Sequence, residues 1–386
     1  MREFKIFIIV VFFTALVYWG VEPFAHSILK PHTSAANFDF AQEDISYAKK
    51  VLKLKQNELN IAKKDLENAK NSNNEEIILA NEIKLKVAQN ALENAKNSLE
   101  ANQALWDRVA KIDLNSGDAA RGKVFIAEFG GLCISCHGIA ADDIPAPITD
   151  SSTGVLPPDL SSSGIIYDDK FLAALILNPA LALKVEHKNT LTMPPYEAED
   201  EAQTHKDIAD IIAYLKEVAQ KDETKFLKDK KLELENSYAK LNLNEKDKND
   251  LIAKDLLFAQ QKRQFIDACA RCHDLKYDGI KMLSSPNDLK SYLGSIPPDL
   301  SMYIRSRGIE YLHNFVNNTQ KLLNGTAMPR VGLNEKAQGN VISYMEKVGD
   351  SKKDQRQSIG LYIMGFFFIL SIFAYLWKRK IWANLH

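Results

Sequence analysis

The chain has 386 residues, 26% of them charged, and a formal net charge of −1 at pH 7. This length leaves room for two or three domains. The balanced charge, together with the lack of an extended basic block, gives no support for nucleic-acid binding. All four cysteines belong to the two motifs described below, so none is left for a disulfide framework.

The N-terminal residues 1–30 are expected to direct the chain to a membrane. An apolar run from Ile6 to Trp19 follows Arg2 and Lys5, as in a secretory signal peptide or an uncleaved signal anchor. Ala25-His26-Ser27 fits the small-residue rule for a cleavage site only loosely, so the anchor is the favoured interpretation.

Residues 40–112 contain neither proline nor glycine and carry a seven-residue pattern. Large apolar residues recur every seven positions with alanines offset by three, and the pattern is interrupted by a turn signal, Asn71-Ser72-Asn73-Asn74. Alternating large residues and alanines let two helices pack closely. The pattern predicts an antiparallel helical hairpin, either a docking or spacer element or, as we favour, an insertion that packs on its neighbours. The large residues are Ile45, Leu52, Leu59, Leu66, Ile78, Leu85, Leu92, Leu99 and Trp106.

Two copies of a Cys-x-x-Cys-His motif follow, Cys133-Ile-Ser-Cys136-His137 and Cys269-Ala-Arg-Cys272-His273. This motif is the attachment signature of a c-type haem. Two thiols at i and i+3 can both form thioethers with the haem vinyl groups, and the next histidine can ligate the iron. A zinc site would need two further ligands. The sequence therefore predicts two covalently bound haem c groups, with His137 and His273 as iron ligands.

The residues around these motifs form an internal repeat of two modules, 113–220 and 249–350. Each module has a helix before its cysteines, a Pro-Pro-Asp-Leu-Ser segment, a Met-Pro pair and a closing amphipathic helix that carries a tyrosine. Between them, the charged segment 221–248 has leucines seven residues apart and is expected to be a helical linker. The repeated features are Pro157 to Ser161 and Pro297 to Ser301, Met193-Pro194 and Met328-Pro329, and Tyr214 and Tyr344.

The two Met-Pro pairs supply the expected sixth iron ligands, Met193 and Met328. A thioether in that position closes the iron to small molecules and raises its potential, which makes the haem a one-electron carrier. Met193 is the only methionine of its module, and His187 and His205 are the competing ligands. In the second module Met282, Met302 and Met345 compete, and the last two are expected to be core residues of their helices.

Other residues near the motifs have more general expected roles. A backbone carbonyl of each Pro-Pro segment can accept the second N–H of the haem histidine, which orients the ring. The segment can equally be a rigid turn that caps the next helix through Asp159 or Asp299, and both roles can hold at once. Arg305 and Arg307 either bind haem propionates through charge-assisted hydrogen bonds or lie on a solvated helix face. The remaining histidines, His26, His32, His313 and His386, are expected at the surface or at interfaces.

Near the C-terminus, residues Ile359 to Trp377 form a 19-residue run without a charge. Such a run is long enough to cross a bilayer core of about 30 Å. Basic residues lie on both sides of it, so charge alone does not decide its orientation. Because c-type haem is attached outside the bacterial cytoplasmic membrane, the modules are expected in the periplasm and the tail after Trp377 in the cytoplasm.

The segment from Pro297 to Arg307, Pro-Pro-Asp-Leu-Ser-Met-Tyr-Ile-Arg-Ser-Arg, followed by Tyr311, resembles cytochrome c1. Cytochrome c1 is the haem subunit of the quinol–cytochrome c reductase (cytochrome bc1) complex, and it also has a single C-terminal anchor. The resemblance implies that Arg305 or Arg307 meets a haem propionate. The usual cytochrome c1 has one haem, so this chain resembles the two-haem variants of some bacteria. The first module alone resembles a class I cytochrome c, and the hairpin belongs to neither pattern.

Together, these features predict an all-α chain with two class I cytochrome c-like domains, a helical hairpin and terminal membrane helices. The resemblance implies a subunit that takes electrons from a Rieske iron–sulfur protein, contacts cytochrome b in the membrane, and passes electrons to a soluble cytochrome c or a terminal oxidase. The alternatives are a tethered dihaem shuttle, a dihaem subunit of a cbb3-type oxidase, or a dihaem peroxidase with one open iron. No bond-making active site is expected on this chain alone, because no nucleophile–base pair, phosphate loop or further metal cluster is evident.

Overall fold

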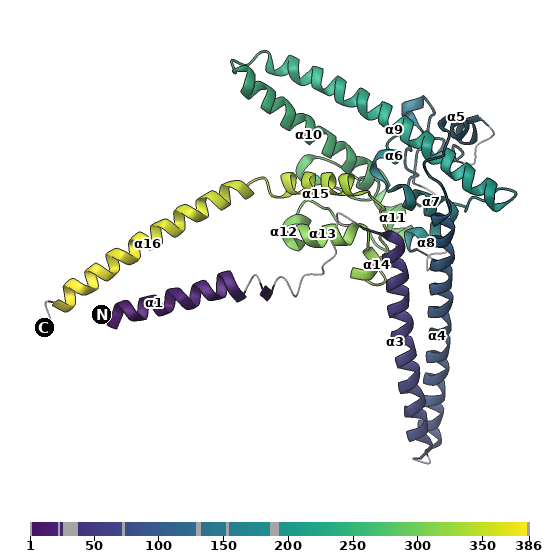
Figure 1. Cartoon of the computed structure of the whole chain (residues 1–386), viewed down its shortest axis with the longest axis horizontal. Coiled ribbons are helices and arrows are strands. Elements are labelled where there is room, and N and C mark those ends of the chain that lie inside the picture. The colour runs from purple at the N-terminus through teal and green to yellow at the C-terminus, as the bar shows by residue number, and fades with distance from the viewer. Residues whose placement is uncertain are drawn as a thin grey trace. The chain divides into compact units, whose positions relative to one another are not determined.

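A computed structural model describes residues 2–21, 24–25, 38–71, 74–128, 133–151, 154–185 and 193–383 (Figure 1). The chain divides into two compact units, Met1–Phe38 and Asp39–His386. Within the described ranges the secondary structure is helical, and the β-structure is limited to three isolated bridges. The expected all-α class is therefore confirmed.

The first unit contains helix α1 (Arg2–Ala15), which continues into the π-helix η1 (Leu16–Val21). Residues Glu3–Val21 are long and apolar enough to cross a membrane. The cleavage-site residues His26 and Ser27 lie outside the described residues, as do His32, His187 and His386.

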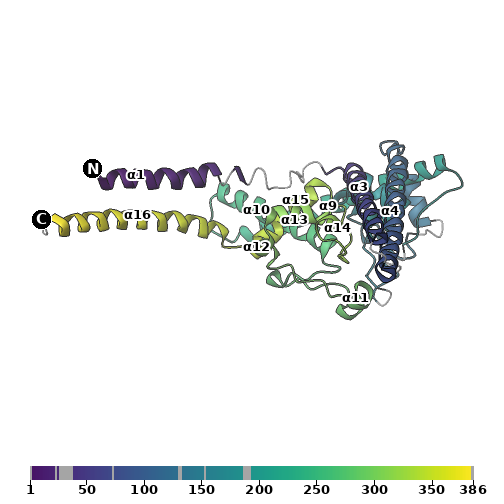
Figure 2. The ribbon, with the colours of Figure 1, turned by 90° about the horizontal axis from the view of Figure 1, so that it is seen from below.

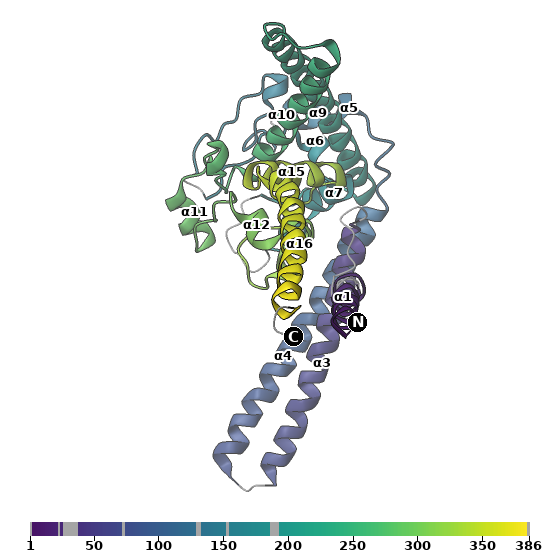
Figure 3. The ribbon, with the colours of Figure 1, turned by 90° about the vertical axis from the view of Figure 1, so that its left-hand side faces the viewer.

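The second unit begins with the helical hairpin of α3 (Phe40–Lys70) and α4 (Glu75–Ala110), which lie side by side in Figures 1 and 3. Side chains of Asp39 and Asn74 accept hydrogen bonds from the first turns of the two helices and so satisfy N–H groups that have no partner within the helix. All nine large residues of the seven-residue pattern are buried or half-buried. Alanines between them, such as Ala62 and Ala95, are also buried and allow the close packing.

The first module is built around the crossing of a short N-terminal helix with a long C-terminal one. Helix α5 (Ala119–Lys123) runs into the π-helix η3 (Val124–Glu128) and packs against α9 (Glu201–Tyr238). The contact is close because Gly122 has no side chain: an ideal Cβ there would overlap the carbonyl oxygen of Asp210. The turn η4 (Ala140–Asp142) and helices α6 (Ser163–Ile166), α7 (Asp169–Leu177) and α8 (Pro179–Leu183) complete the module.

The second module repeats this crossing with α10 (Glu245–Cys269) and α15 (Glu335–Gly349). Here the contact is aromatic, since the rings of Phe258 and Phe265 each lie 5.3 Å from that of Tyr344. Figures 2 and 3 show α11 (Pro286–Leu293) at the periphery of this module. Between the crossing helices the chain forms η5 (Lys276–Asp278), α11 (Pro286–Leu293), α12 (Tyr303–Arg307), α13 (Ile309–Val316) and α14 (Thr319–Leu322).

The segment 221–248, predicted as a helical linker, is not a separate element. Helix α9 continues through it to Tyr238, and α10 begins within it at Glu245. The two helices form a second hairpin whose arms belong to the two modules (Figure 3). The sequence indicated helical periodicity here correctly, but the turn after Tyr238 lacks Pro and Gly and so gave no strong signal.

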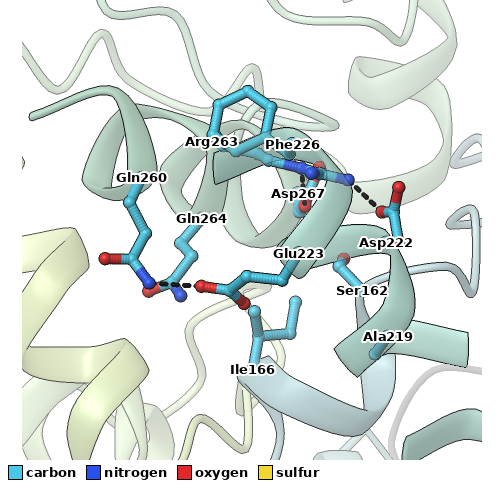
Figure 4. Close-up of a pocket in the computed structure, with 10 residues that line it drawn as sticks. All are labelled: Ser162, Ile166, Ala219, Asp222, Glu223, Phe226, Gln260, Arg263, Gln264 and Asp267. Carbon is cyan, nitrogen blue, oxygen red and sulfur yellow. Dashed lines mark hydrogen bonds and ion pairs between the residues drawn. The ribbon is translucent and has the colours of Figure 1, made fainter. Parts of the chain in front are cut away.

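A small pocket lies between α6, α9 and α10, where this second hairpin meets the first module (Figure 4). Arg263 forms an ion pair with Asp222, and its guanidinium lies 4.6 Å from the centre of the Phe226 ring. Gln260 donates a hydrogen bond to Glu223. These contacts join α9 to α10 and hold the two modules together at their junction.

The modules also pair directly through their loops. Tyr167 and Leu333 form an antiparallel bridge, and Asp168 N donates to Gly332 O at 3.0 Å. On another part of the interface, Ser151 Oγ donates to Asp288 at 2.7 Å and accepts from Ser285 N at 2.8 Å. The second module ends at α15, and α16 (Lys353–Ala383) follows; its residues Ser358–Ala383 are long and apolar enough to cross a membrane.

Candidate functional site

The first Cys-x-x-Cys-His motif forms a single tight turn. The backbone N–H groups of Cys136 and His137 both donate to Cys133 O, at 3.2 and 2.9 Å. The imidazole Nδ1 of His137 lies 2.8 Å from the backbone oxygen of Pro158. Because a carbonyl oxygen only accepts, Nδ1 carries the proton, and Nε2 keeps the lone pair with which a histidine ligates a metal.

The second motif has the same geometry. Cys272 N and His273 N donate to Cys269 O at 3.2 and 3.0 Å, and His273 Nδ1 lies 2.8 Å from Pro298 O. The acceptor is thus a carbonyl of the Pro-Pro segment in both modules, as the sequence predicts. A ring held in this way presents Nε2 in a fixed direction.

Burial keeps both imidazoles neutral. It lowers the pKa of His137 and of His273 below the usual range, although the hydrogen bond to proline opposes the shift in each case. A neutral imidazole is the form that binds a metal ion, so these two rings are ready to coordinate without first losing a proton.

All four cysteines are free thiols and form no disulfide. Burial raises the pKa of Cys133 and of Cys272, and raises that of Cys269 to about 12. Reactive and zinc-binding cysteines are instead thiolates in electropositive surroundings. Among the described residues no group of three or more His, Cys, Asp or Glu side chains forms a metal cage. The thiols therefore fit thioether attachment better than metal coordination.

The turn after each haem histidine is held by the Pro-Pro-Asp-Leu-Ser segment. Asp159 accepts from Ser161 N at 2.8 Å and from Ala140 N at 3.0 Å, and Ser161 Oγ accepts from Ala141 N at 3.0 Å. Leu160 N donates to Gly138 O at 2.9 Å. These bonds fix the histidine loop against the proline carbonyl that orients the imidazole.

The second module reproduces these bonds. Asp299 accepts from Ser301 N at 3.0 Å and from Lys276 N at 3.4 Å, while Ser301 Oγ accepts from Tyr277 N at 3.1 Å. The alternative expectation that Asp159 and Asp299 cap the following helix is wrong, because α6 and α12 begin without a side-chain cap. Both carboxylates bind the turn behind the histidine instead.

The tyrosine of each closing helix is also bound to this turn. Tyr214 donates to Asp142 at 2.8 Å, and Tyr344 donates to Asp278. A lysine from the first helix of the module pairs with the same carboxylate, Lys123 with Asp142 and Lys262 with Asp278, both at 2.8 Å. The first helix, the histidine turn and the last helix of each module are thus joined at one carboxylate.

Met193 and Met328 are both half-buried residues of loops. Of the competing residues in the second module, Met345 is a core residue of α15, as predicted, with 4% of its surface exposed. The prediction that Met302 is a core residue is wrong: it is 45% exposed and accepts a hydrogen bond from the Tyr277 hydroxyl at 2.8 Å. Met302 precedes α12 as its N-cap, and the apolar residue that this helix buries is Ile304.

The competing histidine His205 lies on α9, where its Nε2 is 3.0 Å from Glu201 Oε1. Arg305 and Arg307 are both exposed on α12, and the Arg307 guanidinium lies 5.5 Å from the centre of the Tyr311 ring. This arrangement matches the solvated helix face that was one of their two expected roles.

Two buried or half-buried arginines were not singled out from the sequence. Arg271 lies between the cysteines of the second motif. Burial raises the pKa of Tyr167 in the first module, and the positive charge of Arg271 opposes that shift. Its positive charge also adds to the effect of burial in lowering the pKa of His137. A charge of the second motif therefore acts on the histidine of the first motif. The other arginine, Arg330, directly follows Met328-Pro329 and is 2% exposed.

Residues 119–219 match the family model for cytochrome c. The first module is a cytochrome c domain. The match covers α5, the first Cys-x-x-Cys-His turn and the buried part of α9, and so includes the crossing of α5 with α9 described above. Proteins of this family carry covalently bound haem c and transfer electrons, so the match supports electron transfer by a c-type cytochrome domain. No curated protein and no solved structure matches the chain.

The residues of this cytochrome c domain fit a covalent haem. Cys133 and Cys136 are free thiols one helical turn apart, and His137 is neutral and oriented through Nδ1. Met193 lies in the loop that enters α9. Haem bound at these residues supplies reversible one-electron chemistry at its iron.

Proposed function

We propose that this chain is a membrane-anchored dihaem cytochrome c of the c1 type. In this role it passes electrons from the Rieske iron–sulfur protein of a quinol–cytochrome c reductase to a soluble cytochrome c or a terminal oxidase. The observation that carries the proposal is the repetition of the histidine turn, bond for bond, in a module that the cytochrome c family match does not reach.

The second haem is supported by the shared hydrogen bonds. The proline acceptor, the Asp-Ser bonds behind the turn and the tyrosine–aspartate bond recur in the second module. An imidazole oriented through Nδ1 is a specific arrangement that serves metal coordination. We therefore assign Cys269, Cys272 and His273 to a second covalent haem c, with Met328 as its sixth ligand.

Electron transfer within the chain is supported by the packing of the modules. The positive charge of Arg271 in the second motif acts on both Tyr167 and His137 of the first module. The loops on either side pair through Tyr167 and Leu333. Two haems held in one compact unit exchange an electron by a short intramolecular step, which replaces a diffusional encounter.

In this proposal the protein's own residues keep both irons closed to other ligands. The proline carbonyls hold the imidazoles, and Met193 and Met328 would supply the second protein ligand of each iron. The surrounding burial lowers the dielectric and, with the thioether ligands, favours the reduced state of the haem. These features suit a carrier better than a dihaem peroxidase, which needs one open iron.

The terminal helices support a membrane arrangement. We place α16 across the bacterial cytoplasmic membrane, with Lys378, Arg379 and Lys380 on the cytoplasmic side and both haem modules in the periplasm. The apolar residues Glu3–Val21 serve as the signal anchor or signal peptide. Cytochrome b is the expected neighbour of α16 within the bilayer.

The c1-type assignment further places Arg305 or Arg307 at a haem propionate. Their exposure leaves both guanidinium groups accessible to an anionic group. A tethered dihaem shuttle, or a dihaem subunit of a cbb3-type oxidase, is the second candidate. It is favoured by the fact that the matching family is cytochrome c in general.

Affinity purification from membranes in a mild detergent tests the proposal. We expect stoichiometric cytochrome b and Rieske protein in the purified material. Recovery of oxidase subunits would support the cbb3-type role instead, and recovery without any membrane partner would support the shuttle. Either result would contradict the reductase assignment.

A further inference from the structure

The base of the α3–α4 hairpin holds one buried carboxylate, Asp44, that binds three elements at once. Asp44 is 5% exposed. Arg330 reaches it with two nitrogens, at 3.0 and 2.5 Å, and Lys184 Nζ lies 2.8 Å away. Trp106 of α4 donates its indole N–H to the same carboxylate at 3.0 Å. Asp44 thus joins the hairpin to the residue that ends α8 in the first module and to the loop after Met328 in the second.

This contact reaches the loop of the second iron ligand directly. Arg330 is only two residues beyond Met328, and its backbone N–H donates to Leu183 O of the first module at 3.1 Å. Its guanidinium also lies 5.3 Å from the centre of the Phe40 ring at the start of α3. Both the backbone and the side chain that follow Met328-Pro329 are therefore held by other parts of the molecule.

The hairpin also binds the loop that follows the first methionine. Arg108, near the end of α4, donates to Glu197 at 3.1 Å and to Glu201 at 2.9 and 2.8 Å. Glu197 is four residues beyond Met193, and Glu201 is the first residue of α9. The ring of Phe40 packs on Phe171 of the first module, with centroids 5.3 Å apart.

Asp44 differs from a carboxylate in a surface ion pair because its charge is buried. Burial alone would raise the pKa of Asp44, but the charges and hydrogen bonds of Arg330 and Lys184 together hold it below its usual range. A buried ion pair fixes the positions of its two side chains. The loss of one partner leaves an uncompensated charge in the interior. Removing the carboxylate charge would therefore release Arg330 from its position.

We propose that the base of the hairpin is a positioning element for the two methionine loops. Asp44 positions Met328 through Arg330, and Arg108 positions the loop after Met193 through Glu197. The hairpin then helps to determine which residues ligate the haem iron. It also fixes the position of one module relative to the other. The Asp44 part rests on the proposed second haem, whereas the Arg108 part requires only the haem of the cytochrome c domain.

The test substitutes Asp44→Asn in the full-length, haem-loaded chain in detergent. The new side chain has the same shape and can still accept from Trp106, but it has lost the charge that binds Arg330. We expect the second haem alone to lose its methionine ligand. In the ferric spectrum one of two haems would lose its long-wavelength sulfur-to-iron band, the ferrous form would gain one carbon monoxide site, and one of two potentials would fall.

Glu43→Gln is the matched control. Glu43 is the neighbouring residue of the same helix, and its carboxylate also binds the second module, with Lys321 Nζ at 2.6 Å. That pair does not involve the Met328 loop, so the control should keep both methionine bands and bind no carbon monoxide. A contact that only stabilises the fold would lower the melting temperature in Asp44→Asn without changing the spectrum of either haem.

Arg330→Lys provides a second variant in case Asp44→Asn does not accumulate. Lysine keeps the charge but has lost the two-nitrogen contact, so we expect a smaller fall in the same potential. Arg108→Gln should in turn shift the potential of the first haem only.

The outcomes separate this inference from the proposed function. A wild-type chain with one haem would refute the second haem and the Asp44 part with it. Two haems whose spectra and potentials are unchanged in the Asp44 and Arg330 variants would overturn the Asp44 part alone. An unchanged first haem in Arg108→Gln would likewise overturn the Arg108 part.

Discussion

The two modules share the turn that holds the histidine but differ in how their first and last helices cross. In the first module the crossing depends on Gly122, which lets α5 approach the backbone of Asp210, and on the ion pair of Arg121 with that residue at 2.7 Å. In the second module the aromatic rings of Phe258, Phe265 and Tyr344 fill the crossing.

This difference shows which parts of a haem module are constrained by chemistry and which by packing alone. The histidine turn has to present one nitrogen in one direction, so its bonds recur in both modules. The helix crossing only has to exclude water, and a glycine contact or an aromatic cluster does this equally well. Only the module with the glycine crossing matches the cytochrome c family.

Removal of each methionine ligand would be the strongest test of the likeness between the modules. We expect Met193→Ala and Met328→Ala each to lower the potential of one haem and to open that haem to carbon monoxide, because a thioether ligand raises the potential and closes the iron. Redox titration followed in the visible spectrum would measure both effects. Unchanged spectra in either variant would refute that ligand, and Met302→Ala serves as a control that should leave both haems unaffected.

Substitution of one glycine by alanine in each module would test the difference between the two helix crossings. Gly122→Ala should destabilise the first module by about 1–3 kcal/mol, because the new methyl group would overlap the backbone of α9. Gly339→Ala, on α15 with no atom within 4 Å of the new Cβ, should instead stabilise the second module by about 0.5–1 kcal/mol. Calorimetric unfolding would measure the two changes. Equal effects of the two substitutions would contradict the proposed difference.

The closing tyrosines should behave alike in the two modules. Tyr214→Phe and Tyr344→Phe each remove one hydrogen bond to a carboxylate that a lysine still binds. We expect each substitution to reduce the free energy of unfolding by about 0.5–1.5 kcal/mol. Denaturant titration would compare them, and a large effect in one module only would show that the shared bond has different roles.

The same carboxylates predict a small dependence of stability on acid. The bonds from Lys123 and Tyr214 lower the pKa of Asp142, and those from Lys262 and Tyr344 outweigh burial and lower the pKa of Asp278. A lowered pKa in the folded state stabilises the fold above the unfolded value of about 3.9, and this contribution is lost as the pH falls through the folded value. Melting temperatures measured below about pH 4 should therefore fall less in Asp142→Asn than in the wild type. An equal dependence of the melting temperature on pH in Asp142→Asn and in the wild type would contradict this assignment.

The sequence was most informative where chemistry or periodicity leaves few alternatives. The Cys-x-x-Cys-His spacing and the Pro-Pro segment predict the turn and its carbonyl acceptor, and both lie where expected. The seven-residue pattern of 40–112 likewise predicts residues that are buried or half-buried in the hairpin. In each case the structure depends on residues close together in the chain.

The sequence was least informative where contacts join distant parts of the chain. Asp44 and Arg330 are separated by 286 positions, and no local pattern relates them. A signal was nevertheless present, since Asp44 lies four positions before the alanine Ala48 of the pattern and so on the same helix face, where a carboxylate needs a partner. The end of α9 and the exposure of Met302 were missed for a different reason: both depend on where a helix ends, which local composition defines poorly.

The number of haems on the wild-type chain is the most direct test of the account. The purified full-length protein should be assayed for haem by its reduced pyridine complex and for protein by amino-acid analysis, and the intact chain should be weighed by mass spectrometry. The account predicts two haems per chain, both retained after acid extraction because they are covalently bound. One haem per chain, attached at Cys133 and Cys136, would contradict it and would leave the second module with a haem turn that holds no haem.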